Sequence, residues 1–240
     1  MKNKAIELLN SFDEEIRDTV KLNYPGYLGA MSCCFNHSYV NAYMVMKTMP
    51  NAVMVADELS WLNIYGREVT VKRDQGIPVI VPGVMTRTDD KVAGGRLVIR
   101  KMDDQNRFEA VKVQNIVFYP KIDVLYDISQ TVGRDINKPK IDSSNWEKNT
   151  SKSLQGYKVN TKDENTVKTS ILYAVSRYFG LTFPEDALSG PGQFLSALSL
   201  ENLRIVLHKI QTTLCDLIHQ IIRQKTFDLS ITRGIERTLV

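Results

Sequence analysis

The stretch that decides the fold is YVNAYMVMKTMPNAVMVADELSWLNIYGREVTVKRDQGIPVIVP, residues 39–82. Its first part places apolar side chains at helical spacing after Ser38, a residue type that favours the position before the first helical turn. Pro50 ends this run because its ring is incompatible with a helix interior. After Gly66 apolar and polar residues alternate, which is typical of strands. The pattern predicts a helix over residues 38–49 followed by extended chain.

Two shorter patterns complete this stretch. Residues 52–55 fit either a short extended run or the start of a second helix that reaches Trp61. Residues 67–71 alternate, residues 77–81 are apolar, and the polar residues 72–75 lie between them. The spacing predicts a β-hairpin with a basic tip.

Outside this stretch the sequence predicts a helix near the N-terminus and strands in the middle of the chain. Apolar residues recur every three or four positions over residues 3–22, and the sequence Tyr-Pro-Gly-Tyr at 24–27 ends that predicted helix. Strands are predicted over residues 96–102, 108–113 and 117–128, with a polar turn at 103–107. We therefore expect an α+β fold, in which a small, mostly antiparallel sheet packs against N-terminal helices and a C-terminal helical segment follows.

The last hundred residues divide into a polar part and a helical part. Residues 134–165 are rich in Lys, Ser, Asn and Asp without periodicity, which predicts a linker or a long surface loop. An amphipathic helix is predicted over residues 166–179, a loop over 181–192 and a long final helix over 198–225. The predicted domains are residues 1–133, the linker 134–165 and the helical segment 166–240.

Composition describes an ordinary globular protein. The chain has 240 residues, 43% hydrophobic and 24% charged, with no apolar run long enough to span a membrane and no signal-peptide pattern. Its three cysteines cannot form a disulfide framework and favour a reducing compartment, so we expect a cytoplasmic protein without a membrane partner. Residues 62–140 hold 14 basic and 10 acidic side chains, an excess of four within a net charge of +4. This is a weak polyanion signal, and it excludes a highly acidic DNA mimic.

The order of these motifs resembles the N-terminal domain of ArdC-type antirestriction proteins of plasmids, conjugative elements and phages. The resemblance covers about residues 35–133 and includes a second segment, VLYDISQT at 124–131. Residues 72–76 lack the first glycine of the turn that this family usually has. The motifs that carry the resemblance in the first segment are Ser38 and Asn41 on a helix, Met49-Pro50-Asn51-Ala52, Trp61, Gly66-Arg67 and the Lys72-containing turn.

The resemblance implies single-stranded DNA binding that protects the DNA of a mobile element from restriction. Such binding needs cations for phosphates and aromatic faces for bases. The candidate residues also fit purely structural roles. Trp61 fits a core position, Asn41 could hydrogen-bond the helix to the sheet, and the basic tip could be a solvated turn. The predicted nucleic-acid-binding residues are Ser38, Asn41, Trp61, Tyr65, Arg67, Lys72 and Arg73.

The last helices resemble those of the zinc-metallopeptidase domain that usually follows in this family. That domain needs a His-Glu-x-x-His helix, and here the three histidines, His37, His208 and His219, are followed by Ser, Lys and Gln. His208, Cys215 and His219 share one side of the last helix but are too far apart along it for all three to ligate one ion, although Cys215 and His219 could do so together. We therefore predict a non-enzyme, without metal or cofactor, that keeps a remnant of the peptidase domain.

A second hypothesis is a protein-binding inhibitor of a host defence enzyme, or an accessory factor of DNA transfer. The last helix offers the surface, because four apolar residues broaden its stripe: Ile205, Val206, Ile218 and Ile222. The same breadth also fits burial within the monomer or a homo-oligomer.

Overall fold

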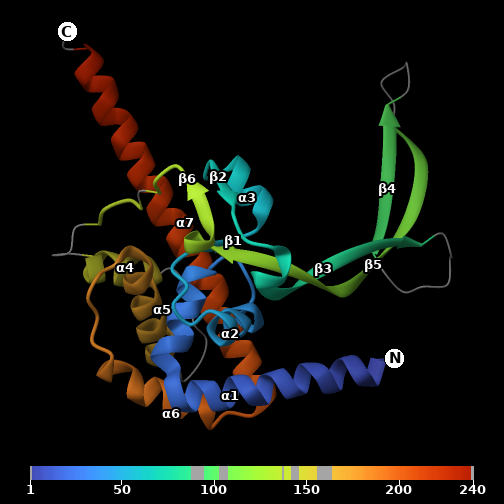
Figure 1. The fold of residues 1–240 in the computed structure, drawn as a ribbon, viewed down its shortest axis with the longest axis horizontal. Helices are drawn as coiled ribbons and strands as arrows, with labels where there is room; N and C mark the ends of the chain where they lie inside the picture. Colours follow the sequence, from blue (N-terminus) through green and yellow to red (C-terminus); the bar gives the residue numbers. More distant parts are fainter. Residues whose placement is uncertain are drawn as a thin grey trace. The chain divides into compact units, whose positions relative to one another are not determined.

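The computed structural model describes residues 2–87, 95–102, 108–136, 138–141, 146–155 and 164–238 (Figure 1). Its contacts divide the chain into two compact units. One unit joins residues 1–77 to residues 124–240, and the other comprises residues 78–123. Helices and small antiparallel sheets are combined, so the predicted α+β fold is confirmed.

The first helix, α1 (Lys2–Cys33), consists of two helical segments that meet at a kink beside the predicted stop. Asn23 leaves helical geometry with φ −151° and ψ 64°, and its Oδ1 accepts a hydrogen bond from the Gly26 N–H at 3.0 Å. Asn23 thus caps a new helical segment, whose first turn tolerates Pro25 because amide groups there lack helical partners. The first helical segment therefore ends where the sequence predicts, and the second segment, which starts directly at this cap, is the part that the sequence does not predict.

Helices from both ends of the chain share one core. α1 packs against α2 (Tyr39–Thr48), α5 (Glu164–Phe179), α6 (Ser189–Ser196) and α7 (Leu200–Thr238). Tyr27 and Leu28 of α1, Val175 of α5 and Leu207 and Leu214 of α7 are fully buried. The predicted boundary between an N-terminal domain and a C-terminal segment therefore does not follow the packing, because α5–α7 complete the core that α1 begins.

The predicted linker contains a helix. α4 (Trp146–Gln155) lies within residues 134–165 and packs against α5. Trp146 and Leu154 are buried there, and the Trp146 ring lies 6.2 Å from that of Phe183. Two large apolar residues in a polar segment are enough to dock a helix, which corrects the linker prediction for residues 146–155.

Helix ends follow local signals. Ser38 caps α2, as predicted, and Asp57 caps the short α3 (Glu58–Asn63), which follows the two-residue strand β1 (Val55–Ala56). Gly180, with φ +68°, ends α5 in a conformation that glycine adopts without strain. The predicted loop at 181–192 instead holds the 3₁₀ turn η3 (Asp186–Leu188) and the start of α6, and α7 runs past its predicted end.

The two strands that flank the 3₁₀ turn η1 (Arg73–Gln75) do not pair with each other as predicted. β2 (Arg67–Val69) pairs antiparallel with β6 (Thr131–Gly133), whereas β3 (Ile77–Arg87) neighbours β5 (Phe108–Asp127). The hairpin predicted over residues 67–81 is therefore absent from these described residues. The chain changes sheet at Gly76, where an added Cβ would lie 2.2 Å from the Val124 side chain.

The pairing of residues 96–102 with 108–113 is confirmed. β4 (Gly95–Met102) pairs antiparallel with β5, from Gly95 opposite Ile116 to Met102 opposite Phe108, with a bulge at Ile99/Arg100. The two strands predicted at 108–113 and 117–128 form one strand of 20 residues. The predicted turn at 103–107 lies outside the described residues.

A buried carboxylate joins three helices of the first unit. Asp13 of α1 forms an ion pair with Arg204 of α7, and its Oδ1 accepts a hydrogen bond from the Tyr39 hydroxyl of α2 at 3.2 Å. The Tyr27 hydroxyl donates to the Tyr39 carbonyl at 2.8 Å. Because a buried charge is costly without partners, this network fixes how α1, α2 and α7 pack.

We predict that Asp13→Ala lowers the free energy of unfolding by about 2 kcal/mol, because it removes the buried carboxylate that pairs with Arg204 and accepts from Tyr39. Urea denaturation measures this. Asp18→Ala is the matched control, since Asp18 is an exposed acid on the same helix and should change stability by less than about 0.5 kcal/mol. Equal effects of the two substitutions would contradict the role of Asp13.

Candidate functional site

The exposed cations of the predicted site lie on a firmly held turn. Lys72 and Arg73 are exposed at the start of the 3₁₀ turn η1 (Arg73–Gln75). Gln75 Oε1 accepts a hydrogen bond from the Lys72 N–H at 3.1 Å, and Gln130 Nε2 donates to the Gln75 carbonyl at 2.8 Å. Together with the tight packing of Gly76, these contacts fix the backbone that presents the two cations.

Trp61 serves the core instead of a ligand. It is 0% exposed, and its Nε1–H donates to the Tyr126 carbonyl at 2.8 Å. Met54, Ala56 and Tyr126 pack around it, and the half-buried Tyr65 ring lies 5.1 Å from the indole. Burial raises the pKa of the Tyr65 hydroxyl. Trp61 has no free face for a base, so its predicted stacking role is wrong, whereas Tyr65 keeps one partly exposed side.

Ser38 and Asn41 act on the local helix. Ser38 Oγ accepts a hydrogen bond from the Asn41 N–H at 3.3 Å and so caps α2. The Asn41 side chain is 2% exposed. The predicted contact of Asn41 with a DNA strand is therefore wrong, because its amide lies inside the helical core.

Arg67 holds two strands together. Its Nε donates to Thr131 Oγ1 at 2.7 Å and its Nη2 to the Thr131 carbonyl at 2.8 Å. Its Nη1 donates to the carbonyls of Arg134, at 2.6 Å, and Gly133, at 3.3 Å. These hydrogen bonds join β2 to β6 and its following residue, so the predicted role of Arg67 as a phosphate donor is corrected to that of a structural tie.

The thiols and histidines do not form a reactive cluster in the described part of the chain. No group of three or more His, Cys, Asp or Glu residues there could hold a metal ion. Cys33 and Cys34 are buried, and the hydrogen bond with Cys33 together with burial raises the pKa of the Cys34 thiol. A thiol with a raised pKa stays protonated and is a poor nucleophile at neutral pH.

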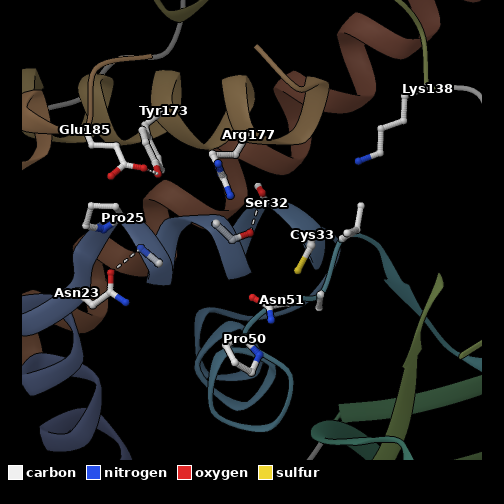
Figure 2. A pocket seen from close by; sticks show the side chains of 14 residues that line it. Asn23, Pro25, Ser32, Cys33, Pro50, Asn51, Lys138, Tyr173, Arg177 and Glu185 are labelled. Atoms are coloured by element: carbon white, nitrogen blue, oxygen red, sulfur yellow. Dashed lines mark hydrogen bonds between the residues drawn. The ribbon is translucent and has the colours of Figure 1, made fainter. Parts of the chain in front are cut away.

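A polar cleft of about 420 Å³ lies within the unit formed by residues 1–77 and 124–240 (Figure 2). The bent part of α1 forms one wall and the α2–β1 loop, residues 50–53, another. Lys138 and two residues of α5, Tyr173 and Arg177, complete it together with Glu185. Figure 2 shows Tyr173 and Glu185 near one another, Lys138 at the opposite end and Arg177 between them.

Each charged group of the cleft has a defined environment. The Lys138 Nζ donates to the Tyr178 carbonyl at 2.9 Å and lies 4.3 Å from the centre of the Tyr178 ring. Burial lowers the pKa of Lys138, while Cys33 and Asp127 act against this shift. The Tyr173 hydroxyl donates to Glu185 Oε1 at 3.2 Å, and burial followed by the Glu185 charge raises its pKa. The Arg177 carbonyl accepts a hydrogen bond from the Gly180 N–H, but its guanidinium has no hydrogen-bond or ion-pair partner among the residues that the structure describes.

Sequence reasoning missed this cleft. Lys138 lies in the segment predicted to be a linker, and Arg177 occupies an ordinary exposed position of an amphipathic helix. Neither position carries a local signal, since they meet only when α5 packs against α1.

Comparison with protein-family models, curated proteins and solved structures finds no match for this chain. No helix in the described ranges is long and apolar enough to cross a membrane.

We predict that Arg67→Ala lowers the free energy of unfolding by about 2 kcal/mol, because carbonyls at the end of β6 lose a charged donor. Thermal or urea denaturation measures the change. Arg73→Ala, a matched arginine on an exposed turn, should stay within about 0.5 kcal/mol of the wild type. A stable Arg67→Ala protein would show that these hydrogen bonds contribute nothing.

Proposed function

We propose that the chain is a non-enzymatic protein that binds single-stranded DNA and acts as an antirestriction or other anti-defence protein of a mobile element or phage. The observation that carries this proposal is the anchored η1 turn, on which Lys72 and Arg73 are exposed. A rigid turn presents two cations to phosphates without first having to be ordered.

The paired strands β2 and β6 continue from this turn and lengthen the surface on which a phosphate backbone could lie. The Thr70 N–H donates to the Gln130 carbonyl at 3.0 Å and prolongs the ladder toward Lys72. The exposed Arg134 lies at the other end, where its carbonyl accepts a hydrogen bond from the structural Arg67. Lys72 follows Arg67 by five positions, a span of at most about 16 Å along the chain. Positive charge at both ends of this length supports contacts with more than one nucleotide.

The biological role and location belong to the same proposal. The motifs that resemble ArdC-type proteins support protection of incoming DNA from a host defence. The three free cysteines support a cytoplasmic location, because a reducing compartment keeps such thiols unpaired.

A protein-binding inhibitor is the second candidate, and α3 supplies the observation that favours it. Leu59, Leu62 and Ile64 are 68%, 51% and 71% exposed on and just after this short helix. Clustered exposed apolar side chains are typical of protein interfaces. Of the surface predicted on α7, Val206 and Ile218 are buried within the protein, whereas Ile205 is 57% exposed.

We predict that the intact chain binds a labelled single-stranded oligonucleotide more tightly than the corresponding duplex, measured by fluorescence anisotropy across a salt series. Lys72→Ala with Arg73→Ala should weaken single-strand binding by about tenfold. The salt slope should fall by about 1.4, which is 0.7 for each of two lost phosphate contacts.

The matched control is Lys148→Ala with Lys152→Ala, which removes the same charge from exposed positions of α4. An equal loss in both double variants would mean that only net charge matters and would contradict the η1 site. Absence of binding at low salt would contradict DNA binding altogether and favour a protein target for the α3 surface.

A further inference from the structure

The polar cleft holds two cations that no carboxylate of the described residues neutralises by an ion pair. We propose that it binds a small organic phosphate of nucleotide size, whose phosphate lies between Lys138 and Arg177 and whose other end donates a hydrogen bond to Glu185. This inference does not rest on the proposed DNA binding, because none of the cleft residues belongs to the η1 turn.

Arg177 is placed to meet an anion. Figure 2 shows its side chain directed into the cleft toward α1. Gly29 provides the space, since a Cβ added there would lie 4.0 Å from Arg177 Nε and a longer side chain would reach the guanidinium. With no partner among the described residues, the guanidinium keeps its planar set of donors for a ligand.

Lys138 supplies a second cation in a less exposed place. One of its three N–H donors is used by the Tyr178 carbonyl, and two remain for a ligand. The ammonium is half-buried, and the Tyr178 ring below it limits its hydration. A bound anion would offset this loss of hydration, so an anion should bind here more favourably than at a fully solvated lysine.

At the end of the cleft opposite Lys138, Glu185 favours a ligand that carries a hydrogen-bond donor. Glu185 accepts a hydrogen bond from the Tyr173 hydroxyl, and its carboxylate has further acceptor sites. Asn51 also lines the cleft and adds an amide. A ligand with a hydroxyl or amino group distant from its anionic group would satisfy both ends, whereas an anion alone would leave Glu185 without a ligand partner.

Size and geometry favour a phosphate over a carboxylate. About 420 Å³ falls in the range of small-molecule sites and far exceeds what a simple ion needs. The phosphate group has three terminal oxygens and can accept from a guanidinium and an ammonium at once, while a carboxylate has two. The summed formal charge of Lys138, Arg177 and Glu185 is +1, so the cleft attracts a net anion.

Isothermal titration calorimetry on the intact chain tests the inference with three probes: inorganic phosphate, a nucleoside 5′-monophosphate and the same nucleoside without phosphate. We expect the monophosphate to bind most tightly, inorganic phosphate more weakly, and the nucleoside not measurably. Arg177→Gln should weaken monophosphate binding by about tenfold, the effect of losing one charged pair of hydrogen bonds. Lys148→Gln, an exposed lysine of α4 outside the cleft, should leave the affinity unchanged.

Glu185→Gln tests the other end. It should reduce the ratio of monophosphate affinity to inorganic phosphate affinity, because only the larger ligand reaches Glu185. Both Arg177 and Glu185 are exposed, so neither substitution disturbs the core. An unphosphorylated oligonucleotide added as a competitor distinguishes the sources of phosphate: displacement of the monophosphate would assign the cleft to the backbone of a nucleic acid and overturn a small-molecule ligand.

Absence of heat with every probe, or equal effects of Arg177→Gln and Lys148→Gln, would overturn the inference. The Lys72→Ala and Arg73→Ala protein should bind the monophosphate as the wild type does. Failure of DNA binding and failure of phosphate binding are thus separate results.

Discussion

One buried carboxylate supports both candidate surfaces. Asp127 is 2% exposed, and its Oδ1 accepts hydrogen bonds from the N–H groups of Val53, at 2.7 Å, and Met54, at 3.0 Å. Its Oδ2 accepts from the Ser129 N–H at 3.0 Å and hydroxyl at 2.7 Å. These donors offset the cost of burying a charge. They tie the α2–β1 wall of the cleft to η2 (Ile128–Gln130), whose Gln130 holds the η1 turn.

Some polar side chains are hydrogen-bonded within the fold and others are exposed, and only the exposed ones can contact a ligand. Tryptophan and arginine side chains can bind nucleic acids by stacking on bases and by donating to phosphates. Here Trp61 donates instead to the Tyr126 carbonyl, next to Asp127, and Arg67 donates to the Thr131 carbonyl in β6. A buried indole N–H or a guanidinium against a sheet needs such partners. We therefore propose binding at the exposed cations of the η1 turn and at those of the cleft. In the cleft, burial lowers the pKa of Lys138, while Cys33 and Asp127 act against this shift.

Local patterns predicted those parts of the fold that local chemistry decides. The Ser38 cap, the Gly180 stop and the alternation in β4 and β5 act over a few residues, and those predictions agree with the structure. Which sheet a strand joins depends on distant residues, so the hairpin at 67–81 was wrong. Burial decides whether a side chain can contact a ligand, and the sequence alone allowed Trp61 to be either a core residue or a ligand-binding one. Lys138 and Arg177 line one cleft only because segments more than a hundred residues from α1 pack against it.

The most direct test of this account is amide hydrogen exchange in Asp127→Asn, which keeps the shape of the side chain but places an NH₂ group against backbone donors. If Asp127 supports both surfaces, protection should fall at Val53 and Met54 beside the cleft and at Gly76 after η1, while Leu207 in α7 stays protected. Unchanged protection at Val53, Met54 and Gly76 would contradict the account, as would an equal loss at Leu207, which would indicate general destabilisation.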